Sequence, residues 1–163
     1  MSSPASIAKH PIHPMLVVFP IGLWVFSLLS DVVFLVGGSE QWNDIAFYTM
    51  AGGLIGALAA AIPGLFDMLS ISDPKVGKIA WNHMIFNAIA VVIFAADLSA
   101  RILSRPGATL PVLLSVAGIV FLALAGWLGG EMVYVHGAGV EQRPRNGVSE
   151  RHGKRQGNVR HFG

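Results

Sequence analysis

The sequence predicts an all-α integral membrane protein, a bundle of four helices that each cross the bilayer. Two observations carry this prediction. Hydrophobic residues make up 53% of the chain and charged residues only 12%, whereas a soluble domain carries about 25% charged residues. The few charges also avoid four long apolar runs, which contain Asp31 as their single charged residue and cover residues 14–36, 45–66, 84–96 and 106–130.

The lengths of these runs set the expected helices. A helix needs about 20 residues to cross a hydrocarbon layer about 30 Å thick. The first, second and fourth runs reach this length alone. The third run reaches it when it is extended to include His83, Asp97 and Arg101. We therefore expect one domain over residues 1–139, with helices at about 14–37, 45–71, 79–103 and 109–135.

The first apolar run is an anchor rather than a signal peptide, because the apolar part of a signal peptide is only about 7–15 residues long. Four spans place both termini and the loop 72–78 on one side. Nine of the eleven Lys and Arg residues lie on that side, six of them in the tail 140–163. The positive-inside rule then predicts that both termini are cytoplasmic.

The basic tail contains almost no apolar residues, so it cannot bury a core and is expected to be disordered. It can adhere to anionic lipid headgroups or simply fix the topology. Since the rest of the chain lies in the membrane, no nucleic-acid partner is expected.

The chain contains no cysteine. Iron–sulfur clusters and c-type haem are therefore excluded, because both need cysteine sulfur. A b-type haem or a metal held by histidine remains compatible with the composition. The sequence contains no hydrolytic or nucleophilic motif, so any enzymatic activity would be that of a redox protein.

Two histidines stand at the start of the first run, in the stretch "KHPIHPMLVVFP" at residues 9–20. His10 and His13 each precede a proline, which disfavours helical geometry. We expect residues 10–13 to be extended and Pro14 to lie in the first turn of the helix. Residues three apart share a face in extended polyproline geometry and in a helix, so the two imidazoles are expected to point together.

The direction of each span brings further polar residues to the same end of the bundle. His83 lies about one turn into the third helix and Asp67 about one turn before the end of the second. Ionisable groups in membrane helices are costly and usually face a partner or a cavity. The predicted polar layer at the cytoplasmic end consists of His10, His13, Asp67, His83, Glu131 and His136.

This layer favours a site for haem b or a transition metal, because imidazole binds both and carboxylates add oxygen ligands. His83 and His136 are the first candidates for direct ligands, since each belongs to the cytoplasmic end of a membrane helix. His10 and His13 would complete the same site or a second one, and Asp67 and Glu131 would act as ligands or orient imidazoles. A proton or ion path and a purely structural role at the helix ends are the alternatives.

A second group lies at the other end. Asp97 and Arg101 are four residues apart on the third helix, and Asp31 lies at a similar depth on the first. We expect a salt-bridge network that joins these helices, with an ion or substrate contact as the alternative. The second helix carries a small residue at every fourth position, which permits close packing within the bundle or in a homo-oligomer; these residues are Gly52, Gly56, Ala60 and Gly64.

The chain resembles the DUF2231 family of bacterial four-span membrane proteins over residues 8–140, and four sequence features carry this resemblance. They are "HPIHPMLVVFPIGLW" (10–24), "PGLFD" (63–67), the lone His83 and "GGEMVYVHGAGV" (129–140). The resemblance implies a bacterial cytoplasmic membrane. It also implies electron-transfer chemistry, because relatives can be joined to Rieske or cytochrome c modules. Some relatives have a histidine where this chain has Val18.

The sequence thus predicts a membrane protein with a His-rich site that binds haem b or a transition metal and acts in electron transfer. Its partners would be the lipid bilayer and either a quinone or a separate redox protein. A small transporter or proton path is one alternative, although few polar residues lie between the two ends of the bundle. A structural subunit of a larger membrane complex is the other.

Overall fold

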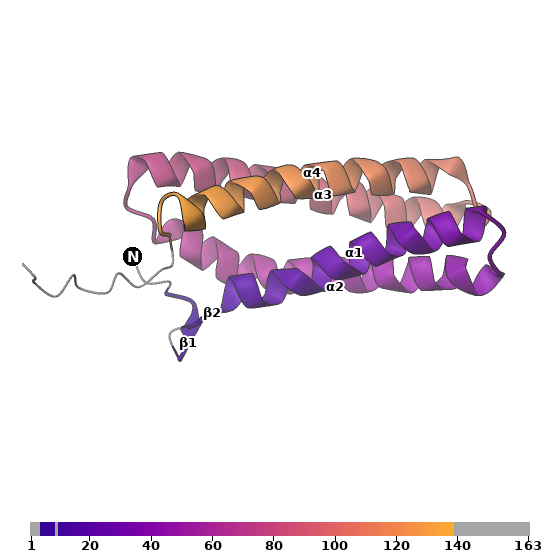
Figure 1. Cartoon of the computed structure of the whole chain (residues 1–163), viewed down its shortest axis with the longest axis horizontal. Coiled ribbons are helices and arrows are strands. Elements are labelled where there is room, and N and C mark those ends of the chain that lie inside the picture. The colour runs from indigo at the N-terminus through magenta and orange to yellow at the C-terminus, as the bar shows by residue number, and fades with distance from the viewer. Residues whose placement is uncertain (1–3, 9, 139–163) are drawn as a thin grey trace, which may run out of the picture.

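The computed structural model describes residues 4–8 and 10–138. Four helices, α1 (Ile12–Leu35), α2 (Glu40–Leu69), α3 (Pro74–Leu103) and α4 (Thr109–Tyr134), form an antiparallel bundle (Figure 1). A short antiparallel hairpin of β1 (Ser6–Ile7) and β2 (His10–Pro11) precedes α1. The predicted four-helix bundle is confirmed. The tail 140–163 lies outside the described residues.

The prediction of an extended stretch at residues 10–13 is only half right. His10 and Pro11 are extended, but α1 begins at Ile12, so His13 is helical. The helix tolerates Pro14 because it lies in the first turn, where backbone N–H groups have no partner within the helix. The first helix therefore begins two residues before the expected limit.

The second and third helices also begin about five residues before their expected limits. α2 begins at Glu40, whose negative charge suits the positive end of the helix dipole. α3 begins at Pro74, and the Asp73 side chain accepts a hydrogen bond of 2.8 Å from the backbone N–H of Lys75. The first turns of both helices thus contain polar residues, which lie outside the apolar runs of the sequence.

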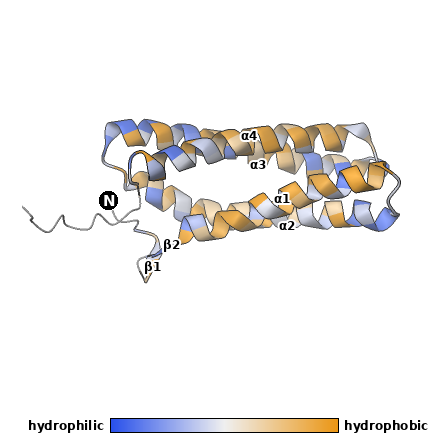
Figure 2. Cartoon of the chain, viewed as in Figure 1, coloured by the Kyte–Doolittle hydropathy of each residue, from blue (hydrophilic) through white to orange (hydrophobic). Residues whose placement is uncertain are grey.

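Hydrophobic residues predominate along the middle of the helices, and hydrophilic residues lie mainly toward the two ends of the bundle (Figure 2). The helices contain 24, 30, 30 and 26 residues, and each is long and apolar enough to cross a membrane. Large apolar side chains point outward on every helix, among them Phe19, Ile55, Val92 and Val120. In water this surface would be strongly unfavourable, whereas lipid chains can cover it.

The bundle consists of two helical hairpins, because α1 packs mainly on α2 and α3 packs mainly on α4. At one end α1 and α3 begin and α2 and α4 end; this is called the histidine end, after His13 and His83. The loops 36–39 and 104–108 lie at the opposite end, called the arginine end after Arg101. Figure 1 shows the β1–β2 hairpin beside the histidine end.

The hairpins meet in a core centred on two aromatic rings. Trp24 and Phe94 stack with their ring centres 4.0 Å apart and their planes 19° apart. Both side chains are buried. A β-carbon on Gly53 would lie 2.5 Å from Trp24 Nε1, and one on Gly118 would lie 2.6 Å from two atoms of the Phe94 ring. The two glycines therefore make room for the stacked pair.

The small residues of α2 serve contacts inside the chain. A β-carbon on Gly56 would lie 3.2 Å from Pro20 Cδ, and one on Gly64 would lie 2.7 Å from His13 Nδ1. Both glycines therefore bring α2 close to α1. This is the intramolecular packing expected from the spacing.

Candidate functional site

His13 lies on the first turn of α1 and points toward α2. Its Nδ1 is 2.8 Å from the backbone oxygen of Ala60. A carbonyl oxygen can only accept a hydrogen bond, so Nδ1 is the donor, and in the neutral ring this leaves the lone pair on Nε2. Gly64, one turn after Ala60, leaves room for the ring.

His83 occupies the corresponding place between α3 and α4. Its Nδ1 is 2.8 Å from the backbone oxygen of Ala125, so this ring too is protonated at Nδ1. A β-carbon on Gly129, one turn after Ala125, would lie 3.2 Å from His83 Cε1. Asn87 Nδ2 lies 3.1 Å from His83 Nε2 and also donates to the His83 backbone oxygen at 2.9 Å.

The two imidazoles lie next to each other between the hairpins. The ring centres of His13 and His83 are 6.3 Å apart and the ring planes are perpendicular, at 88°. Both residues are partly buried. Ala60 and Ala125 each lie nine residues before the last residue of their helices, which places the pair about 14 Å inside the end of the bundle.

The other two histidines of the predicted layer lie nearer the surface. His10 is exposed in β2, and its Nδ1 lies 2.9 Å from the backbone oxygen of Ala8. His136 is exposed just beyond α4, and its Nδ1 lies 3.3 Å from the backbone oxygen of Glu131. Among residues 4–8 and 10–138, no ring contact joins either of them to His13 or His83.

The two carboxylates of the layer are both partly buried at the histidine end. Asp67 accepts a hydrogen bond of 3.3 Å from the backbone N–H of Ala5, which ties the segment before the β hairpin to the end of α2. Glu131 lies in the last turn of α4. Within the part of the chain that the structure describes, no three His, Cys, Asp or Glu side chains are grouped to hold a metal ion.

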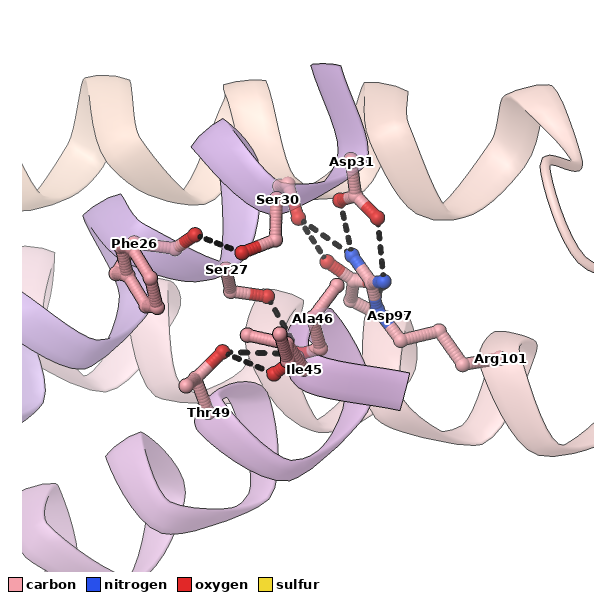
Figure 3. A network of polar contacts seen from close by, with 10 residues as sticks. Phe26, Ser27, Ser30, Asp31, Ile45, Ala46, Thr49, Asp97 and Arg101 are labelled. Atoms are coloured by element: carbon pink, nitrogen blue, oxygen red, sulfur yellow. Dashed lines mark hydrogen bonds and ion pairs between the residues drawn. The ribbon is translucent and has the colours of Figure 1, made fainter. Parts of the chain in front are cut away.

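A polar network crosses the bundle near the arginine end (Figure 3). Arg101 donates to both oxygens of Asp31, at 2.8 and 2.6 Å, and its Nε donates to Asp97 at 2.9 Å. Ser115 on α4 donates to Asp97 at 2.5 Å and accepts from Arg101 at 3.1 Å. The predicted salt-bridge network between the first and third helices is confirmed, and it extends to α4.

Beside this network lies a cavity of about 190 Å³ at the arginine end. Its polar lining residues come from three helices and from the loop before α4, and they include Asp31, Asn43, Asp44, Arg101 and Arg105. Since Arg101 is already bonded to three side chains, the network serves first to join helices. The cavity gives the buried ion pair a polar environment on its outer side.

The sequence did not indicate several residues that position the imidazoles. The acceptors on Ala60 and Ala125 are backbone groups, which carry no sequence signal. Asn87 is a polar residue in an apolar run, and its place four residues after His83 puts the two on one helix face. The four-residue spacing of Ala60 and Gly64 recurs at Ala125 and Gly129, and this recurrence is a sequence signal for the two positions that hold the imidazoles.

Fold and site together define an integral membrane four-helix bundle with a pair of neighbouring histidines between its two hairpins. The chain belongs to the DUF2231 family, described as predicted membrane proteins, whose model matches residues 9–142. This match confirms the family resemblance seen in the sequence. Neither a curated protein nor a solved structure matches the chain.

Proposed function

We propose that the chain binds haem b or a transition metal between His13 and His83 and takes part in electron transfer within the membrane. The observation that carries this proposal is the pair of neighbouring imidazoles, with ring centres 6.3 Å apart, contributed by two different hairpins. Histidine is rare in membrane helices without a functional role. Here two lie together, well inside the bundle.

The protonation of the rings suits metal binding. A histidine that donates Nδ1–H to a backbone carbonyl is held in orientation and keeps Nε2 for a metal. His13 and His83 both make such a bond. Two imidazoles bound to one metal at about 2.0–2.1 Å have ring centres about 6 Å apart when they lie opposite each other, which is close to the separation of this pair.

Asn87 restricts the site. Its amide already occupies Nε2 of His83, so a metal at that nitrogen would replace this hydrogen bond. The second hydrogen bond of Asn87, to the His83 backbone oxygen, could remain. In the free chain Nε2 of His83 is thus held by a weak neutral donor, whereas no hydrogen bond to Nε2 of His13 is found among the described residues.

The proposed orientation follows the distribution of charge. In the sequence, nine of the eleven Lys and Arg residues come before α1, in the first turns of α3 or in the tail 140–163, so the positive-inside rule favours the cytoplasmic side of a bacterial cytoplasmic membrane for the histidine end. The electron partner would then be a quinone dissolved in the lipid or a separate redox protein. His10 and His136 lie on the outer side of the site and would contact such a partner rather than the metal.

The test is the spectrum of the protein purified in detergent from haem-sufficient cells, recorded as dithionite-reduced minus air-oxidised. Bound haem b would give sharp α and Soret bands, and elemental analysis of the same sample would detect a metal without haem. His13→Ala and His83→Ala are expected to lower the bound cofactor at least tenfold. The matched controls His10→Ala and His136→Ala should keep it.

Two results would contradict the proposal. One is a sample with neither haem bands nor a stoichiometric metal. The other is equal cofactor content in all four histidine variants, because the cofactor would then be bound elsewhere.

A further inference from the structure

The buried positions of the two hairpins correspond. On α1 and α3, buried residues recur 70 positions apart, in the pairs Pro20 and Ala90, Trp24 and Phe94, and Ser27 and Asp97. On α2 and α4 they recur 65 positions apart, in the pairs Ala46 and Pro111, Met50 and Ser115, Gly53 and Gly118, and Ala60 and Ala125. Every buried residue of α4 thus has a buried counterpart on α2.

The contacts within each hairpin correspond as well. Each histidine is bonded through Nδ1 to an alanine carbonyl of its partner helix, and a glycine one turn further on makes room for the ring. Eleven residues after each histidine stands the aromatic residue that packs against a glycine of the partner helix. The two hairpins therefore repeat one local design.

Three contacts join residues that are counterparts of each other. These are the His13–His83 ring pair, the Trp24–Phe94 stack and the Asp31–Arg101 ion pair, each between positions 70 apart. In a two-fold arrangement, only residues at the axis can contact their own counterparts. The axis therefore passes through all three contacts. It runs along the bundle, since α1 and α3 begin at the same end.

We infer that the bundle is built from two copies of one helical hairpin, and that the candidate site is a composite site on the axis between them. Its ligand is bound by one imidazole from each copy. The ligand part of this inference rests on the function proposed above. Parallel repeats related by an axis along the membrane normal are a known architecture of membrane proteins.

The axis also narrows the class of ligand. A ligand on this axis meets one imidazole from each hairpin, of which His83 also contacts the Asn87 amide, and it needs one coordination position for each ring. The iron of haem b offers two such axial positions and brings its other ligands with it. A bare zinc ion needs about four ligands, and no third His, Cys, Asp or Glu joins the pair among the described residues. The composite site thus favours an iron porphyrin.

The two hairpins carry opposite charges at one pair of corresponding positions, and this difference favours the pairing of one hairpin with the other. Asp31 of the first hairpin meets its counterpart Arg101 of the second, at 2.6 Å. If either hairpin paired with a second copy of itself, two like charges would meet in the membrane at this point, which is costly. The ion pair therefore selects the pairing of unlike hairpins, and each chain completes one site.

The inference is tested first by exchanging counterparts in the full chain. Trp24→Phe leaves a void and Phe94→Trp overfills its place, so each single variant should lower the thermal midpoint of the purified protein. The double variant restores the same two side chains in exchanged positions and should recover more than half of the summed loss. A double variant whose loss equals the sum of the single losses would overturn the repeat.

The shared ligand is tested separately by adding haemin to the purified chain. Two axial imidazoles give low-spin ferric haem, one haem per chain, and both His13→Ala and His83→Ala should convert it to a high-spin form. A change in only one of these variants would overturn the composite site. If no haemin binds to the parent chain, the composite haem site and the haem arm of the proposed function fail together. The exchange variants would still decide the repeat.

Discussion

Phe94 lies against Gly118 so closely that a β-carbon on the glycine would come within 2.6 Å of two ring atoms. The Phe94 ring also stacks on Trp24, which joins the two hairpins at the centre of the bundle. In lipid there is little hydrophobic drive between helices, so such close packing has to hold them together. The packing of the core therefore depends on a residue without a side chain at position 118.

Gly118→Ala should destabilise the bundle, while Gly126→Ala on the same helix should not. Overpacking costs about 1–3 kcal/mol, which exceeds the gain of about 1 kcal/mol in helix propensity. A β-carbon on Gly126 meets nothing within 4 Å, so there only the gain applies. Thermal unfolding in detergent measures both variants. A midpoint for Gly118→Ala at or above that of Gly126→Ala would contradict the packing described.

Replacing Arg101 should be among the most damaging single changes. Arg101→Met leaves Asp31 and Asp97 within the bundle without their cation, and breaking a buried pair in this way costs about 3–5 kcal/mol. Arg105→Met is the matched control, because Arg105 is exposed in the loop before α4. Its expected effect is within about 0.5 kcal/mol.

The same unfolding measurement checks the arginine prediction. Asp97→Asn should cost less than Arg101→Met, since an amide can still bond Ser115 and Arg101 while Asp31 balances the charge. If Arg101→Met and Arg105→Met unfold at the same temperature, the network does not contribute to stability.

The four spans could be predicted from sequence because lipid imposes a strict length and apolarity on each helix. The Asp31–Arg101 ion pair could be predicted as well, because a charge at membrane depth needs a partner and the spans fix the depth. The helix starts at Glu40 and Pro74 were missed, since polar first turns lie outside the apolar runs. The charge of Glu40 at the end of the helix dipole and the Asp73 cap before Pro74, rather than hydropathy, favour these two starts.

The pairing within the predicted polar layer could not be read from the sequence. Depth alone groups all four histidines, but rotation about each helix axis decides which side chains meet. That rotation is set by packing at Gly64 and Gly129 and by two backbone carbonyls. The repeat was hidden for a related reason: counterparts such as Met50 and Ser115 share a position but not a chemistry.

Gly64→Ala should lower cofactor binding through His13 alone. The new β-carbon would lie 2.7 Å from His13 Nδ1, so the ring must turn and lose its bond to the Ala60 carbonyl. Loss of an orienting hydrogen bond of this kind typically costs about 10–100-fold in metal affinity. Gly77→Ala is the control, because nothing lies within 4 Å of its β-carbon. Haemin titration that gives equal affinities for the two variants would contradict this role of Gly64.

Asn87→Leu should strengthen cofactor binding, in contrast to the other changes near the site. The Asn87 amide occupies His83 Nε2 in the free chain, so a ligand at this nitrogen must first replace a hydrogen bond of 3.1 Å. A net hydrogen bond is worth about 0.5–1.5 kcal/mol, and its removal should raise haemin affinity by about 2–10-fold. His83 keeps its orientation through Ala125. Asn82→Leu, on the exposed surface one residue before His83, is the matched control and should leave the affinity unchanged. Weaker haemin binding by Asn87→Leu, with thermal stability preserved, would mean that Asn87 supports the ligand rather than competes with it.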